Sequence, residues 1–134
     1  MTASYFFELR LDRSLAQAEV EVRSALSAEG FGVLTEIDVE ATMRDKLGLN
    51  VPAEKILGAC NPRLAHAALQ VEPGAAVLLP CNVVLRDVGE GVTEIRFMDA
   101  EAALGVIGNP ELGPIAKEAG DRLRRVAQSL QAGS

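Results

Sequence analysis

Hydrophobic and polar residues follow two different periods along this chain, and each period marks out one kind of element. Apolar positions every three to four residues predict helices, whereas strict alternation predicts strands. Residues 4–11 alternate and predict a strand. A helical stripe follows, in which Ser14 and Gln17 form a capping-box pattern and Gly30 stands where a helix end favours glycine.

The next part of the chain predicts a strand, a short helix and another strand. Residues 31–39 alternate as a strand with one well-buried face, and Asp38 is placed to cap a short helix over 40–47. A loop leads to a third strand over 55–60. Gly58 removes a side chain in the middle of that strand, so another backbone or a ligand can approach closely there.

A second capped helix separates this strand from a long apolar run. Asn61 and Pro62 form a favourable helix entry, because Asn accepts an amide hydrogen bond and Pro has no amide to satisfy at the first helical position. The helix should end near residue 71. The apolar run over 75–87 predicts a strand, and Pro80 places it at a sheet edge or at a bulge because proline cannot donate to a ladder.

The last third of the chain predicts a hairpin and a long helix. Glycines in the turn over 88–91 join the apolar run to a returning strand over 92–98. Residues 100–104 predict one or two helical turns. From residue 111 or 115 to residue 131 a single apolar stripe indicates a helix that should cover one face of the sheet.

This order of elements predicts one α+β domain over residues 1–134. One hairpin is clear and one parallel crossover is expected, so the sheet should be mixed but mainly antiparallel, with its helices packed on one face. The strand within 75–85 is apolar on both sides. That pattern predicts a homodimer formed through the open face of the sheet.

The composition of the chain indicates its cellular compartment and which classes of partner it is expected to bind. The chain has no Trp, one Tyr and four Phe, so its core must be aliphatic. A net charge of −6 without a basic face argues against nucleic acid as a partner, and the arginines at 122, 124 and 125 are interpreted as the solvated side of a helix. A signal-peptide pattern and an apolar run of bilayer length are both missing, so we expect a cytosolic protein with no membrane partner and with reduced cysteines.

Two Cys-Asn pairs form the candidate site, Cys60-Asn61 and Cys81-Asn82. Each pair lies at the end of, or inside, an apolar run of strand type, so the two pairs meet if those strands are neighbours. Together with Gly58 they would frame a small polar pocket for a small ligand. Cys60 would also lie beside a helix N-terminus, whose positive end lowers the pKa of a thiol.

Two functions remain open for this site. The first is a non-enzymatic homodimeric module that binds a small ligand. The second is a redox or thiol enzyme with Cys60 and Cys81 as catalytic candidates, or a protein that binds a soft metal or haem. A metal would draw on these cysteines and His66, and a haem could also use Met98, although a buried hydrophobic role for the cysteines and a surface role for His66 are ordinary alternatives. The sequence specifies no cofactor and contains no catalytic triad or phosphate-binding motif.

Four blocks of sequence in a fixed order carry a family resemblance. They are GFGVLTEIDV over 30–39, KILGACNP over 55–62, LLPCNV over 78–83 and GNPEL over 108–112. Together the blocks resemble the bacterial and archaeal family called domain of unknown function 302 (DUF302), over about residues 5–130. The resemblance implies an α+β fold with a TBP-like sheet that members use to form homodimers, and it implies no assigned biochemical role. Ala100 stands where the family often has proline, which affects only how that loop turns.

Overall fold

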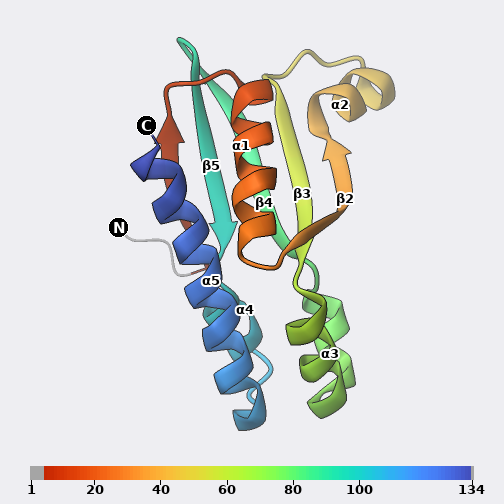
Figure 1. The fold of residues 1–134 in the computed structure, drawn as a ribbon. Coiled ribbons are helices and arrows are strands. Elements are labelled where there is room, and N and C mark those ends of the chain that lie inside the picture. The colour runs from red at the N-terminus through yellow and green to blue at the C-terminus, as the bar shows by residue number, and fades with distance from the viewer. Residues whose placement is uncertain (1–4, 134) are drawn as a thin grey trace.

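The computed structural model describes residues 5–133, which form the single α+β domain that the sequence predicts (Figure 1). Ser4, the first residue of the predicted first strand, lies outside the described residues. The elements are β1 (Phe6–Leu11), α1 (Leu15–Ala28), β2 (Gly32–Asp38), α2 (Val39–Leu47), β3 (Glu54–Cys60), α3 (Pro62–Val71), η1 (Pro73–Leu78), β4 (Cys81–Gly89), β5 (Val92–Met98), α4 (Ala100–Gly105), η2 (Pro110–Leu112) and α5 (Gly113–Ala132).

The five strands form one sheet in the order β1-β5-β4-β3-β2, and every neighbouring pair is antiparallel. The prediction of a mixed sheet is therefore wrong, although the expected crossover between two strands of the same direction does occur. β1 and β2 do run in the same direction, but the crossover through α1 carries the chain from one edge of the sheet to the other. Three strands separate β1 from β2, so no parallel pair forms.

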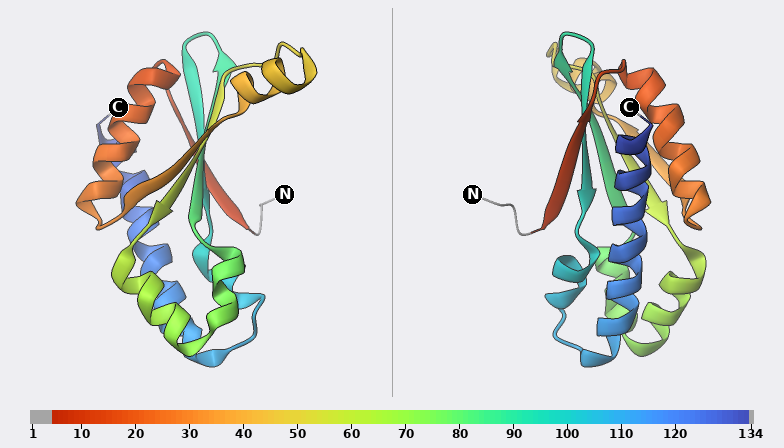
Figure 2. Two further views of the ribbon diagram at one scale, coloured as in Figure 1. Left: turned by 90° about the vertical axis from the view of Figure 1, so that its right-hand side faces the viewer. Right: turned by 60° about the vertical axis from the view of Figure 1, so that its left-hand side comes forward.

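Helices α1 and α5 cover one face of the sheet, and the core lies beneath them (Figures 1 and 2). Both predicted apolar stripes point into this core. The buried side chains include Ala18, Val22 and Leu26 of α1, Leu123, Val126 and Leu130 of α5, and Leu9, Leu57, Val83, Leu85, Ile95 and Phe97 of the strands. Within residues 5–133, no helix is long and apolar enough to cross a bilayer.

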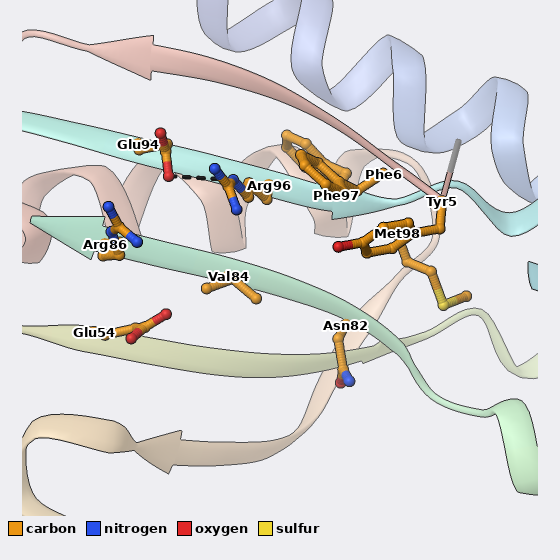
Figure 3. A pocket seen from close by; sticks show the side chains of 10 residues that line it. All are labelled: Tyr5, Phe6, Glu54, Asn82, Val84, Arg86, Glu94, Arg96, Phe97 and Met98. Carbon is orange, nitrogen blue, oxygen red and sulfur yellow. Dashed lines mark ion pairs between the residues drawn. The ribbon is translucent and has the colours of Figure 1, made fainter. Parts of the chain in front are cut away.

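The other face of the sheet has no covering helix. α2 projects on that side at one end, and α3, η1 and α4 gather beyond the opposite end (Figure 2, left). Between them the side chains of the central strands stand on an open surface, part of which Figure 3 shows. This surface is called the open face below.

Side-chain caps fix where the helices begin, as the sequence predicts. Ser14 accepts a hydrogen bond from the amide of Gln17 at 3.2 Å, which starts α1. Asp38 starts α2 by accepting from the amide of Ala41 at 2.9 Å. Each cap satisfies an amide that the first turn of a helix leaves without a partner.

Pro80 shortens the predicted long strand. Residues 73–78 form the 3₁₀ helix η1, and β4 begins at Cys81, directly after the proline. Because proline has no amide to donate, the ladder starts only beyond it. β4 is also the middle strand of the sheet rather than an edge strand, so the prediction of an edge or bulge at Pro80 is wrong.

A bulge turns the outer part of β2 away from the core. Val33 pairs with Ala59, but the next paired residue, Thr35, lies opposite Gly58, so Leu34 is the extra residue. One extra residue reverses the side-chain alternation beyond it. Ile37 is consequently 49% exposed, and the prediction of a strand with a well-buried face is wrong.

The arginines at the end of the chain join α5 to its neighbours. Arg122 donates to the backbone carbonyl of Glu29 at 3.0 Å, and Arg125 donates to the carboxylate of Glu29 at 3.1 Å. Arg124 pairs with Asp99, the cap of α4, at 3.2 Å. These side chains are partly solvated, as predicted, but they also tie α5 to the end of α1 and to the start of α4.

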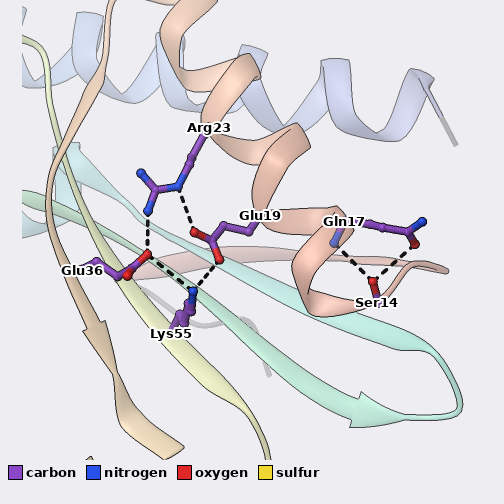
Figure 4. Close-up of polar contacts among 6 residues, drawn as sticks. All are labelled: Ser14, Gln17, Glu19, Arg23, Glu36 and Lys55. Carbon is purple, nitrogen blue, oxygen red and sulfur yellow. Dashed lines mark hydrogen bonds and ion pairs between the residues drawn. The ribbon is translucent and has the colours of Figure 1, made fainter. Parts of the chain in front are cut away.

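An ion cluster fastens α1 to the outer strands (Figure 4). Glu19 accepts hydrogen bonds from Lys55 at 2.8 Å and from Arg23 at 2.9 Å, and Arg23 also reaches Glu36 at 2.7 Å. Burial alone would raise the pKa of Glu19, but the bonds from Lys55 and Arg23 outweigh burial and lower it. Bonding to Glu19 in turn raises the pKa of Lys55.

Replacing Glu19 by glutamine is expected to lower the free energy of unfolding at pH 7 by about 1 kcal/mol, because charge-assisted hydrogen bonds become ordinary ones. Since the pKa of Glu19 lies below its usual 4.5 in the folded chain, this contribution is present above pH 4.5 and is lost as the pH falls through the lowered pKa. Urea unfolding at pH 7 and pH 3 measures both effects. Asp121→Asn, in the exposed Lys117–Asp121 pair, is the control and should cause no resolvable change.

Candidate functional site

The structure divides the predicted site between the two faces of the sheet. β3 and β4 are neighbours, as the site hypothesis requires, with Gly58 opposite Asn82 and Ala59 opposite Cys81. Side chains alternate along a strand, so Cys81 points into the core and Asn82 points to the open face. Only Cys60, Asn61 and Cys81 come together around one cavity.

That cavity, called the thiol cavity below, is small and apolar. Its volume is about 30 Å³, which leaves room for little more than water. Hydrocarbon side chains form most of the remaining wall, namely Phe31, Ala59, Leu64, Ala65, Ala68, Leu79, Pro80, Leu104, Ile115 and Ala119. Asn61 is engaged as the cap of α3, accepting from the amide of Leu64 at 3.2 Å.

Burial makes both thiols weaker acids. It raises the pKa of Cys60 even though this residue lies just before α3, so the prediction that the helix end lowers that pKa is wrong. For Cys81, burial first and the nearby Cys60 second raise the pKa to about 11. Both cysteines are free thiols. A thiol in such surroundings is mostly protonated at neutral pH and therefore a poor nucleophile.

The remaining predicted ligands do not join the thiol cavity. His66 is exposed on α3 and is absent from the cavity wall. Over residues 5–133, no three His, Cys, Asp or Glu side chains are placed to hold a metal ion. Met98 lies elsewhere, on the open face.

Side chains fill the space that Gly58 leaves. A Cβ atom built on Gly58 would collide with the hydroxyl of Thr35 and would lie 2.7 Å from Cγ of Pro80. The close approach that the sequence predicts at this glycine is thus made by Thr35 and Pro80.

A hollow with a mostly apolar lining lies on the open face (Figure 3). Its volume is about 340 Å³, within the range of small-molecule sites. The residues that line it are Tyr5, Phe6, Glu54, Asn82, Val84, Arg86, Glu94, Arg96, Phe97 and Met98. It is called the sheet hollow below. Of the predicted residues, Asn82 of the candidate site and Met98, the possible haem ligand, belong to it.

Strand register sorts the open face into rows that cross the sheet. One row is entirely charged, and it runs through Arg10 of β1, Glu94 of β5, Arg86 of β4 and Glu54 of β3. The next row becomes apolar toward β2, with Glu8, Arg96, Val84, Ile56 and Ile37. A charged row and a partly apolar row therefore lie side by side on the open face.

Glu94 is the buried anion of this surface, with 3% of its area exposed. Arg10 donates to its carboxylate at 3.2 Å, and Nε of Arg96 lies 3.2 Å from it. The guanidinium of Arg96 also stacks on the ring of Phe6, 4.6 Å from its centre. These contacts neutralise a carboxylate that would otherwise be costly to bury.

Three polar side chains of the sheet hollow remain free. Within the described part of the chain, Asn82, Arg86 and Glu54 make no side-chain hydrogen bond or ion pair. Figure 3 shows Arg86 between the strands that carry Glu94 and Glu54. Free polar groups around an apolar floor are the usual composition of a binding surface.

The fold and the open face define a class of small α+β domain in which two helices cover one side of an antiparallel sheet and the other side is left free. Within that class, the chain belongs to the DUF302 family, because the family model described as "Domain of unknown function DUF302" matches residues 7–130. It is similar to the crystal structure of an uncharacterized conserved DUF302 protein from Bacillus stearothermophilus. That likeness has 26% sequence identity and a TM-score of 0.84, and it covers 92% of this chain and 96% of the other. No curated protein matches the chain.

Proposed function

We propose that this protein is a cytosolic, non-enzymatic homodimeric module that binds a small ligand in the sheet hollow. The observation that carries the proposal is the contrast between the two cavities. The sheet hollow measures about 340 Å³, whereas the thiol cavity measures about 30 Å³. An organic ligand fits the first and is too large for the second.

The lining of the sheet hollow favours a ligand with an apolar body and one hydrogen-bonding end. Phe6, Val84 and Met98 supply hydrocarbon and a ring face. The free amide of Asn82 offers both a donor and an acceptor, and the exposed ring of Tyr5 stands at the rim. The protonated thiols give the enzymatic alternative no comparable support.

Exposure of apolar side chains supports the homodimer. Tyr5, which lines the sheet hollow, is 66% exposed, and Ile37, in the same row of the open face as Val84, is 49% exposed. Surfaces of this kind commonly mark an interface. A second copy seated on the open face would cover these side chains and close the hollow around a ligand, in keeping with the TBP-like pairing that the family resemblance implies.

A substitution in the floor of the hollow tests both parts of the proposal. We expect Val84→Glu to convert a wild-type dimer into a monomer, because a desolvated charge would face the second copy. Val20→Glu is the control, since Val20 is 69% exposed on the helical side of the molecule. Light scattering gives the oligomeric state, and native mass spectrometry of freshly purified protein gives the mass of any bound molecule. A wild-type monomer that carries no ligand would refute the proposal.

A further inference from the structure

We infer that the sheet hollow binds a zwitterion, namely an α-amino acid with a large apolar side chain. Its carboxylate pairs with Arg86, its ammonium group pairs with Glu54, and its side chain lies over Val84. This inference rests on the proposed small-ligand site and names the chemical class of the ligand. Two unpaired charges, and their position beside the apolar floor of the hollow, point to this class.

Most charges on this part of the open face are already balanced by their neighbours. Glu94 lies 3.2 Å from nitrogens of both Arg10 and Arg96. Arg96 also lies 3.5 Å from the carboxylate of Glu8. These two cations and two anions compensate one another, so they leave no net charge for a ligand to neutralise.

Arg86 and Glu54 differ from this group because each lines the hollow without a partner. They lie opposite each other on the neighbouring strands β4 and β3. Within residues 5–133, neither side chain forms an ion pair or a side-chain hydrogen bond. One cation and one anion therefore lie on adjacent strands at one end of the hollow, as Figure 3 shows.

This pair of side chains selects the charge of the ligand. An anion bound to Arg86 would also lie beside Glu54, and a cation bound to Glu54 would lie beside Arg86, so each would meet a like charge. A neutral ligand would leave both charges without a partner. A zwitterion satisfies both of them, and a guanidinium suits a carboxylate because it can donate two parallel hydrogen bonds to it.

The apolar floor of the hollow indicates the rest of the ligand. Along β4, Val84 follows about 7 Å from Arg86 and Asn82 about 13 Å from it, on the same face of the strand. Val84, Phe6 and Met98 form an apolar floor for a side chain of the size of leucine or phenylalanine. A polar atom at the far end of a longer side chain would meet Asn82. The volume of about 340 Å³ is at the lower end of the range for small-molecule sites, which also favours a compact ligand.

The three contact points also select one hand of the amino acid. In Figure 3, which looks onto the open face, Arg86 lies above Glu54 and Val84 lies to their right. When the other three substituents contact the sheet, the α-hydrogen of the ligand points to solvent. Seen from that side, the carboxylate, the side chain and the ammonium group follow one another clockwise, which is the arrangement of the L form.

Matched ligands test the class of ligand directly. Isothermal titration calorimetry compares L-phenylalanine with 3-phenylpropionate, which lacks the ammonium group, and with phenethylamine, which lacks the carboxylate. We expect L-phenylalanine to bind about tenfold or more tightly than either analogue, because each analogue loses one charge-assisted contact and keeps one repulsive contact. D-phenylalanine should be weaker by a similar factor, since it cannot make all three contacts at once in this orientation. Equal binding of neutral 3-phenylpropanamide and L-phenylalanine would refute the zwitterion and leave the ligand site of the proposed function intact.

Two substitutions assign the two charged contacts. Arg86→Gln should weaken the binding of L-phenylalanine about tenfold and leave the binding of phenethylamine unchanged or tighter, since the amine does not use Arg86. Glu54→Gln should give the mirror result, weakening L-phenylalanine but not 3-phenylpropionate. A general loss of structure would weaken every ligand, so this crossed pattern distinguishes direct contact from an effect on folding. Circular dichroism checks that each variant is folded.

Two further variants control for net charge. Arg63→Gln on α3 and Glu118→Gln on α5 remove the same kinds of charge outside the hollow, and they should leave every affinity at its wild-type value. Equal affinity for the two enantiomers, or equal effects of Arg86→Gln and Glu54→Gln on all ligands, would overturn the inference. Failure of the wild type to bind any of these phenyl compounds would also overturn it. In that case the proposed function stands if native mass spectrometry finds a bound molecule of another class, and it falls if the protein carries none.

Discussion

Replacing Gly58 by valine is expected to lower the free energy of unfolding by about 3 kcal/mol, the upper part of the usual range for an overfilled site. The new Cβ would strike the hydroxyl of Thr35 and would lie 2.7 Å from Cγ of Pro80. Pro80 has a rigid ring and Thr35 is fixed in the ladder opposite Gly58, so neither neighbour can simply rotate away. Urea unfolding followed by circular dichroism measures the loss.

Gly32 offers a matched control in the neighbouring strand. It is also a strand glycine, but nothing lies within 4 Å of a Cβ built there. Gly32→Val should therefore leave stability unchanged or raise it slightly, because valine suits an extended backbone better than glycine. Equal stability losses in the two variants would show that strand glycines matter here for their backbone freedom and that the contact with Thr35 and Pro80 is unimportant.

The sequence predicts the helices and the hairpin well, because their signals are local. Caps such as Ser14, Asp38 and Asn61 act within one turn, and each starts a helix as predicted. The direction of strand pairing is not local. The partner of β1 is β5, more than eighty residues away along the chain, and alternation alone cannot tell an edge-to-edge crossover from a parallel neighbour.

Strand pairing also explains which part of the predicted site the structure confirms. The rule that neighbouring strands bring Cys60 and Cys81 together holds, since both line the thiol cavity. What the sequence does not give is the volume left after packing, which is set by side chains of α3, α4 and α5 and of the loops before β2 and β4. The charged row takes one residue from each of four strands that are far apart in the sequence, and only the register places Arg86 beside Glu94 and Glu54.

Raising the pH is expected to destabilise the protein through Cys81. Burial, with a smaller effect of Cys60, raises the pKa of this thiol from its ordinary value of 9.0 to about 11 in the folded chain. As the pH rises above 9, the unfolded chain loses the thiol proton first, so unfolding becomes more favourable until the folded thiol also ionises. Over this interval the free energy of unfolding should fall by about 2–3 kcal/mol through this group.

The variant Cys81→Ala isolates this effect from the other groups that titrate at high pH. Its stability at pH 8 should be lower because buried volume is lost, but its decline between pH 9 and pH 11 should be shallower than that of the wild type by the stated amount. The rate of thiol alkylation in the folded protein provides a second measurement, since it follows the thiolate fraction and should still be rising at pH 10. The free energy of unfolding could instead decline equally in the two proteins, and the alkylation rate could stop rising by pH 9. Those results would mean that Cys81 is solvated and that the thiol cavity opens to water. An open cavity of that kind would return the two cysteines to consideration as a reactive pair.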